Sequence, residues 1–397
     1  MDEYVEVTAR PTSWFSKIAG AFRGMIFGGI FFIASFPILF YNEGRAVDVQ
    51  KSLQEGAQAA KSVRIDKVNP ANEGKLIHAS GDVKNPKLLF DQGSGVKRQG
   101  LRLSREVSMY QWAESKNSQK TRNASGGEET KTTYTYKIGW QSGRIDSNKF
   151  KIVNGHENPA IPIMSSTVVA DSAAMGAFSV PEEIVMKIGS LKNFVPNGVP
   201  ETLKTALTGR TITLTPNFLY VGNSPENQEI GDMKIEFKYI PNSPATIVAA
   251  QMDNSFGTYT TSNGKEIMLV EDGSVGLKTM FKRAETRNSY WTWGLRFLGV
   301  MLMFMGLSLI LGPLVAIADV LPFLGSVVSA GAGIVALLLS LCLSSITIAT
   351  AWVFYRPIIG IGLLAAASGC FYLLSQRRSK TVKESQMKST RPTSRAA

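Results

Sequence analysis

The sequence predicts an α+β membrane protein: four transmembrane helices, one N-terminal and three C-terminal, with a large β-rich extracytoplasmic domain. The first observation is that four apolar stretches are free of charged residues, at 25–41, 297–318, 320–355 and 357–376. Each can cross a hydrocarbon core of about 30 Å, which needs about 20 helical residues. The second is that the polar region after the first stretch contains runs in which apolar and polar residues alternate, which is typical of half-buried strands.

Lysine and arginine set the predicted orientation. The tail after Ser375 holds seven of these residues and one glutamate, so we expect it to stay cytoplasmic. With four crossings the N-terminus lies on the same side, and the polar region is exported to the periplasm or a lumen. The expected segments are a cytoplasmic N-terminal segment (1–23), a first transmembrane helix (24–41), the exported domain (42–290), a second helix (291–318), a cytoplasmic loop (319–330), a third helix (331–355), a fourth helix (356–376) and a basic tail (377–397).

Several local patterns predict elements inside these segments. Residues 101–112 and 132–140 form a long hairpin, because each alternates in polarity, and the polar residues 114–131 between them form its loop. Residues 46–61 extend the first transmembrane helix. A capping box from Ser179 to Glu182 opens a helix that ends near Gly189. Pro322 and Gly325 make residues 320–326 a loop, and Leu277, Met280, Phe281 and Ala284 form one apolar helix face.

Cysteine and histidine usage limits the chemistry of the exported domain. Cys342 and Cys370 both lie in membrane stretches, so we expect no disulfide in that domain. His78 and His156 are the only histidines. No metal or cofactor motif is present, so we expect neither a metal nor a cofactor.

A four-residue motif occurs twice, 30 residues apart. Asn42-Glu43-Gly44-Arg45 follows the first apolar stretch, and Asn72-Glu73-Gly74-Lys75 precedes a predicted strand. Asparagine and glycine favour turns, so the motif predicts a helix-exit cap and a strand-entry turn. The alternative is that Glu43 and Arg45 contact lipid headgroups or a neighbouring subunit.

Blocks along nearly the whole chain resemble one known family. They are Tyr-Asn-Glu-Gly-Arg-Ala (41–46), Asn-Glu-Gly-Lys-Leu-Ile-His (72–78), Met-Tyr-Gln-Trp (109–112), Gly-His-Glu-Asn-Pro (155–159), Thr-Trp-Gly-Leu-Arg (292–296), Met-Phe-Met-Gly-Leu (303–307) and Trp-Val-Phe-Tyr-Arg-Pro (352–357). In order and spacing they resemble the transmembrane protein 43 (LUMA) family. The resemblance implies a self-associating four-span protein of the endoplasmic reticulum and inner nuclear membrane that organises membrane protein complexes, with lamins and emerin as animal partners. The long basic tail and the divergence between blocks suggest a bacterial relative, which would lie in the cytoplasmic membrane with a periplasmic domain.

Two groups of residues are the candidate sites. The membrane-junction or interaction group is Asn42, Glu43, Gly44, Arg45, Glu73, Trp112, His156, Asn158, Trp293, Arg296, Tyr355 and Arg356. The helix-packing group is Gly24, Gly28, Ser344, Thr347, Gly360 and Gly362, because small and hydroxyl-bearing residues let membrane helices approach and hydrogen-bond. These helix-packing residues could equally pack within one subunit's bundle.

A non-enzymatic scaffold is the function that the sequence favours. Its expected partners are a second copy of itself, the lipid membrane and other membrane proteins, and no nucleic acid. One alternative is an exported, membrane-anchored hydrolase that uses Glu157 beside His156, or Asp232, as acid and base. The other is a subunit of an oligomeric channel or transporter, although no charged residue lies deep in a predicted span.

Overall fold

The computed structural model describes residues 2–10, 14–122, 128–318, 322–358, 360–362 and 365 of the 397. These residues belong to two compact units. The β-rich unit comprises Met1–Ser13 and Ser52–Thr286, and the helical unit comprises Trp14–Lys51 and Arg287–Ala397. Each unit is described below by itself.

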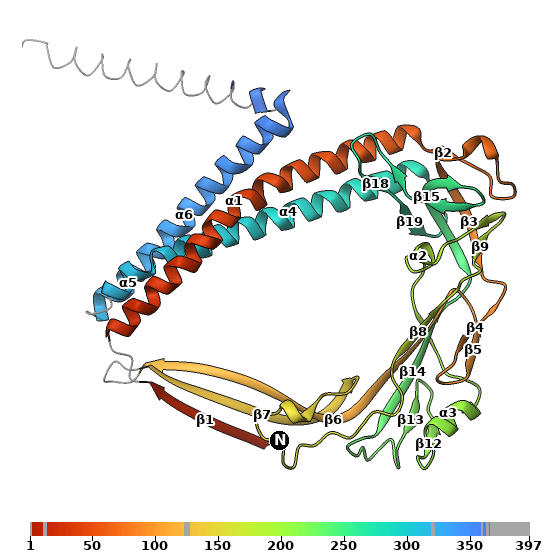
Figure 1. Ribbon diagram of the computed structural model, residues 1–397, viewed down its shortest axis with the longest axis horizontal. Coiled ribbons are helices and arrows are strands. Elements are labelled where there is room, and N and C mark those ends of the chain that lie inside the picture. The colour runs from red at the N-terminus through yellow and green to blue at the C-terminus, as the bar shows by residue number, and fades with distance from the viewer. Residues whose placement is uncertain are drawn as a thin grey trace, which may run out of the picture. The chain divides into compact units, whose positions relative to one another are not determined.

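Three long helices dominate the helical unit: α1 (Trp14–Ala59), α4 (Leu277–Ile310) and α6 (Pro322–Tyr355), with the short α5 (Gly312–Ala318) between the last two. In the described part of the chain, these three are long and apolar enough to cross a membrane. α1 and α4 run side by side in opposite directions (Figure 1), since Gly28 meets Gly306 and Leu39 meets Gly299.

The ends of the membrane helices differ in part from the prediction. The second predicted span divides, because α4 ends at Ile310 and Pro313, which cannot donate a backbone hydrogen bond, lies at the start of α5. The loop predicted at 320–326 is wrong from residue 322 onward, because α6 begins there and proline is well tolerated in a first helical turn. Most of the predicted fourth span (356–376) and the whole basic tail lie outside the described residues.

Two large sheets form the β-rich unit. One has eight strands, with the path β1-β7-β6-β14-β13-β12 and with β11 and β8 attached to β14 and β6. The other has seven, with the path β19-β15-β16-β10-β9-β3-β2, and a further β15–β3 pairing closes part of it into a ring. The strands are β1 (Asp2–Arg10), β2 (Lys61–Ser62), β3 (Leu76–Lys84), β4 (Leu88–Asp91), β5 (Val96–Gln99), β6 (Arg102–Arg122), β7 (Glu128–Ser142), β8 (Ser166–Val169), β9 (Ala174–Met175), β10 (Phe178–Ser179), β11 (Lys192–Phe194), β12 (Ile212–Leu214), β13 (Leu219–Val221), β14 (Met233–Ile240), β15 (Ser243–Met252), β16 (Ser255–Gly257), β17 (Tyr259–Thr260), β18 (Glu266–Ile267) and β19 (Leu269–Asp272).

The β6–β7 hairpin is confirmed, but it is longer than predicted (Figure 1). Strand pairing continues to Arg122 opposite Glu128, so most of the predicted loop 114–131 is strand, and residues 123–127 lie outside the described part. Paired backbone groups sustain this polar stretch, aided by side-chain contacts such as that between the hydroxyls of Ser118 and Thr132, 3.1 Å apart. β1, which lies in the segment predicted as cytoplasmic, pairs with β7.

The core of the β-rich unit follows the predicted alternation. On β14, Met233, Ile235 and Phe237 are almost fully buried while the residues between them are partly exposed. Met280, Phe281 and Ala284 of the predicted helix face are also buried. The capping box is wrong: Ser179 belongs to β10, and the helix that follows, α2 (Glu182–Val185), has no side-chain cap. The remaining helix, α3 (Glu201–Ala206), lies between β11 and β12.

Candidate functional site: a polar cluster that joins three membrane helices

Polar side chains from three helices meet within the helical unit. They are Asn42, Glu43, Arg45 and Gln50 of α1, Asn288, Thr292 and Arg296 of α4, and Trp352, Tyr355 and Arg356 at the end of α6. We call these residues the three-helix polar cluster. The α4 members are four residues apart, so they share one helix face.

Glu43 is the centre of the cluster. Its side chain is 2% exposed, and both carboxylate oxygens are used. Arg296 donates from Nε to Oε1 at 2.6 Å and from Nη2 to Oε2 at 2.8 Å, and Trp352 donates from Nε1 to Oε2 at 2.8 Å. A buried carboxylate is costly unless it is paired and hydrogen-bonded. The bidentate arginine and the indole supply that pairing from two different helices.

Aromatic rings hold the Arg296 guanidinium in place. It lies 4.6 Å from the centroid of the Trp293 ring and 5.7 Å from that of Trp352. Cation–π attraction of this kind adds stability that grows as water is removed. Trp293, a predicted interaction residue, therefore acts in the structure as a support for Arg296.

A second layer of hydrogen bonds joins α1 to α4. The Arg45 guanidinium donates to Asn288 Oδ1 at 3.1 Å and to Thr292 Oγ1 at 3.1 Å, and it also reaches Asn42 Oδ1 at 3.3 Å. Two side-chain amides also donate hydrogen bonds from one helix to the other. Asn42 donates to the Thr292 carbonyl, and Asn288 donates to the Ala46 carbonyl, each at 3.0 Å. Both helices therefore present polar groups that match one another in position.

α6 contacts α1 at a glycine, and a hydrogen bond from the residue after α6 adds to this contact. A Cβ at Gly44 would lie 2.6 Å from the Tyr355 ring, so only glycine permits this approach. Beyond it, Arg356 donates from Nη2 to Gln50 Oε1 at 2.8 Å. Gly44, Tyr355 and Arg356 thus bring the third helix against the first.

The two copies of the four-residue motif have different structures. Asn42 to Arg45 lies inside α1, so the predicted helix-exit cap is wrong; contacts with α4 and α6 outweigh the local turn preference of the motif. The second copy does form a turn before β3. There Gly74 has φ +69°, and the Glu73 carboxylate accepts from the backbone N–H of Asp253.

Trp112, His156 and Asn158 meet one another in the β-rich unit, away from Glu73. The His156 ring stacks on Tyr136 with centroids 4.0 Å apart and meets Trp112 edge-on at 4.6 Å. Asn158 bonds the Trp112 backbone like a neighbouring strand, accepting from its N–H at 2.8 Å and donating to its carbonyl at 2.9 Å. These residues belong to a small aromatic core.

The acid–base residues of the hydrolase alternative are separated. His156 is buried, while the adjacent Glu157 is exposed. Asp232 accepts a hydrogen bond from the Tyr220 hydroxyl and another from the Glu229 N–H at 2.7 Å. Burial and the neighbouring carboxylate raise the pKa of Tyr220.

Some of the helix-packing residues make close contacts within the chain. A Cβ on Gly28 would lie 2.7 Å from the Gly306 carbonyl oxygen, whereas one on Gly24 would make ordinary contact at 3.7 Å with Leu309. Ser344 Oγ lies 3.4 Å from Met303 Sδ of α4, and Thr347 donates to the Leu343 carbonyl of its own helix. A Cβ on Gly360 would lie 2.5 Å from Val353 Cα, and one on Gly362 would meet nothing within 4 Å.

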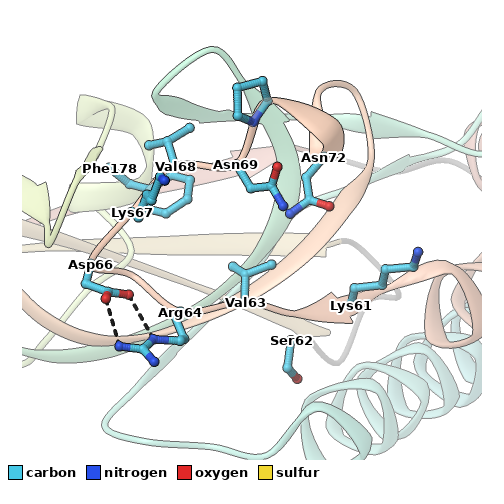
Figure 2. A pocket seen from close by; sticks show the side chains of 11 residues that line it. Lys61, Ser62, Val63, Arg64, Asp66, Lys67, Val68, Asn69, Asn72 and Phe178 are labelled. Atoms are coloured by element: carbon cyan, nitrogen blue, oxygen red, sulfur yellow. Dashed lines mark hydrogen bonds and ion pairs between the residues drawn. The ribbon is translucent and has the colours of Figure 1, made fainter.

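Sequence reasoning missed a cavity of about 720 Å³ in the β-rich unit. Its lining is Lys61, Ser62, Val63, Arg64, Asp66, Lys67, Val68, Asn69, Pro70, Asn72 and Phe178. Figure 2 shows Arg64 and Asp66 facing one another, and this exposed pair lowers the pKa of Asp66. The density of Lys and Arg before Asn69-Pro70 is the only sequence signal for it.

Apolar helices of membrane-spanning length, together with a large β-rich unit, indicate an integral membrane protein with a substantial β-rich domain. The family described as transmembrane protein 43 matches residues 109–357. Transmembrane protein 43 of Mus musculus is 33% identical over 94% of this chain and 93% of its own length. For the Homo sapiens protein the identity is 31%, over 90% of each chain, and for the Drosophila melanogaster homologue it is 28%, over 86% and 92%.

The chain belongs to the transmembrane protein 43 family. These relatives are animal proteins, so the matches do not support the bacterial origin expected from the tail. No solved structure matches the chain.

Proposed function

We propose that this chain is a non-enzymatic, self-associating membrane scaffold that organises membrane protein complexes through its β-rich domain. The observation that carries the proposal is the three-helix polar cluster. Its central carboxylate, Glu43, is satisfied by Arg296 and Trp352 of the same chain and is almost fully buried. Polar groups used in this way fix helix positions and offer no reacting atom to a substrate.

A fixed helix bundle is what a scaffold needs. Interhelical hydrogen bonds hold α1, α4 and α6 together, while the outer faces of the helices expose apolar side chains such as Ile26, Ile30 and Ile33 of α1 and Ile334 and Leu338 of α6. Such faces suit lipid and a second copy of the chain. On this proposal the membrane is that of the endoplasmic reticulum and nucleus, as the family resemblance implies.

Particle mass in a native-like membrane tests self-association. The full chain would be extracted with its lipid and weighed as intact particles. We expect a mass of at least two chains per particle. A single chain per particle, at protein concentrations matching the membrane, would contradict self-association.

Substitution of His156 and Glu157 tests the enzyme alternative. His156→Phe keeps an aromatic ring between Trp112 and Tyr136, and Glu157→Gln changes an exposed carboxylate. A scaffold predicts unchanged particle mass for both variants. Loss of a measurable hydrolysis, with the particle mass intact, would instead support the hydrolase.

Reporter fusions test the proposed fourth crossing. Four crossings place a reporter after Arg395 on the cytoplasmic side and one inserted at Gly126 on the exported side. Three crossings would place both reporters on the same side, and that result would overturn the proposed topology.

A further inference from the structure

Exposed aromatic side chains lie beside the three-helix polar cluster, at one level of the helical unit. We call them the aromatic collar: Tyr41 of α1, Tyr290, Trp291 and Trp293 of α4, and Phe354 of α6, each at least 64% exposed. Contacts made by adjacent residues fix the common level. Asn42 donates to the Thr292 carbonyl, and the Phe40 ring centroid lies 5.8 Å from that of Phe354. The collar therefore marks the same level on all three long helices.

The exposed face of α4 changes its chemical character at the collar. Before the collar its exposed residues include the charged Glu285 and Arg287, and after it they include the apolar Phe297 and Leu298. Tryptophan and tyrosine lie between the two groups. A membrane helix shows this order where it passes from water through the headgroup layer into hydrocarbon. The collar therefore has the composition of a bilayer surface.

The helix length beyond the collar matches the thickness of a bilayer. A Cβ on Gly24 would lie 3.7 Å from Leu309, so these two residues share a second level on α1 and α4. From Tyr41 to Gly24, and from Thr292 to Leu309, the helix is about 26 Å long at 1.5 Å per residue. A hydrocarbon core is about 30 Å thick. The two levels are therefore separated by about the distance between the two surfaces of a membrane.

Arg356 brings a cation to the level of the collar, two residues after Phe354. It is half-buried, and its Nη2 donates at 2.8 Å to Gln50, a neutral residue of α1. Among the residues that the structure describes, Arg356 has no carboxylate partner, and the Glu43 carboxylate is bound by Arg296. A guanidinium has five N–H donors in a planar fork that suits phosphate. At the surface of a bilayer, phosphate is the anion that phospholipids supply.

We propose that Arg356 binds the phosphate of a phospholipid whose glycerol and upper acyl region contacts the aromatic collar. Tyr41 and Phe354 are the collar members on α1 and α6, the two helices that Arg356 joins. Their rings can contact acyl carbons, while the Tyr41 hydroxyl can hydrogen-bond to ester oxygens. The site requires only that the three long helices lie in a bilayer. It depends neither on self-association nor on a fourth crossing, so its failure and the failure of the scaffold proposal are distinguishable.

Spin labels test the depth of the collar. Cys342 and Cys370 would be changed to serine, and Glu285→Cys, Tyr290→Cys and Met305→Cys would be labelled one at a time in liposomes; all three positions are exposed. Accessibility to oxygen and to a water-soluble nickel chelate reports the depth of each label. We expect water at 285, the headgroup layer at 290 and hydrocarbon at 305, about 22 Å farther along the helix. A label at 290 that is as deep as that at 305, or as wet as that at 285, would overturn the proposal.

Lipid binding tests the role of Arg356. The full chain in detergent would be titrated with phosphatidylglycerol, and bound lipid would be counted by native mass spectrometry. We expect roughly tenfold weaker binding for Arg356→Gln, because a charge-assisted hydrogen bond is lost. Arg356→Lys, which keeps the charge, should retain most of the binding. Arg64→Gln, which changes an exposed arginine paired with Asp66 in the β-rich unit, should bind as the unsubstituted chain does.

Two further ligands separate a lipid from a free anion. Diacylglycerol with the same acyl chains lacks the phosphate, so we expect it to bind weakly and equally to the unsubstituted chain and to Arg356→Gln. Inorganic phosphate lacks the acyl chains and should not displace the lipid at equal concentration. Equal phosphatidylglycerol binding by Arg356→Gln and the unsubstituted chain would overturn the proposal. Displacement of the lipid by inorganic phosphate would assign Arg356 to a free anion and would equally overturn it.

Discussion

Arg296 donates to both carboxylate oxygens of Glu43, across 253 positions of the chain. The pair joins α1 to α4, and Trp352 of α6 adds the third helix to the same carboxylate. One carboxylate thus connects all three long helices of the helical unit.

Replacing Glu43 should destabilise the helical unit more than any exposed substitution. Glu43→Gln removes the charge that Arg296 faces, and breaking one partner of a buried ion pair typically costs about 3–5 kcal/mol. We expect a clear drop in the temperature at which helical signal is lost in lipid nanodiscs. Glu285→Gln, on the exposed side of α4, is the control and should change little. Equal melting of the two variants would show that the pair does not hold the helices.

Gly24 and Gly28 of α1 should respond differently to substitution by alanine. Gly28→Ala places a methyl group 2.7 Å from the Gly306 carbonyl oxygen, so α1 and α4 must separate, and overpacking of this kind costs about 1–3 kcal/mol. Gly24→Ala gains an ordinary contact at 3.7 Å. In the same lipid, the melting temperature of Gly28→Ala should therefore be well below that of Gly24→Ala. The reverse order would contradict the observed packing of α1 on α4.

Asn158 should be essential to the aromatic core of the β-rich unit. Its side-chain amide donates to the carbonyls of Trp112 and Ile145, and its oxygen accepts from the Trp112 N–H. Asn158→Asp keeps the acceptor but puts a carboxylate against two carbonyls, so we expect a loss of about 1–3 kcal/mol in unfolding free energy. Tryptophan fluorescence during denaturation would measure it. Asn154→Asp, in an exposed position nearby, should be close to neutral.

Tyr220 gives a pH dependence with a definite sign. Burial first, and then its hydrogen bond to Asp232, raises the pKa of Tyr220 in the folded protein above the ordinary value of about 10. The folded state therefore favours the neutral phenol, and the resulting stability is present below pH 10 and is lost as the pH rises above it. Melting temperature should fall more steeply above pH 10 for the unsubstituted chain than for Tyr220→Phe. Parallel curves would contradict the assignment.

Structural features that depend on a local pattern of residues were predicted well from the sequence. The length of the uncharged stretches predicted α1, α4 and α6. The alternation of apolar and polar residues predicted the β6–β7 hairpin and the buried face of β14. The candidate residues chosen from the sequence also included most of the three-helix polar cluster, because they were chosen at the ends of the membrane stretches, where polar residues occur. Local pattern failed where distant contacts decide the outcome. Asn42 to Arg45 has the composition of a turn, yet packing of Gly44 against Tyr355 and pairing of Glu43 with Arg296 keep it helical.

The pairings themselves could not be predicted. No spacing in the sequence relates Glu43 to Arg296, or the edge of β7 to β1, since each is fixed by how whole elements meet. The cavity beside Phe178 was missed for the same reason: its lining joins residues 61–72 to a strand more than 100 positions later.

The central carboxylate also has a consequence for the order of synthesis. When α1 leaves the ribosome, Glu43 and Arg45 are made more than 240 residues before Asn288, Thr292 and Arg296, and Trp352 comes later still. Glu43 and Arg45 of α1 therefore lack their interhelical partners until α4 is made, and the contact of Glu43 with α6 forms last. A chain that stops before Trp352 lacks the indole N–H that donates to Glu43 Oε2, so its buried carboxylate has one hydrogen bond fewer than in the complete chain.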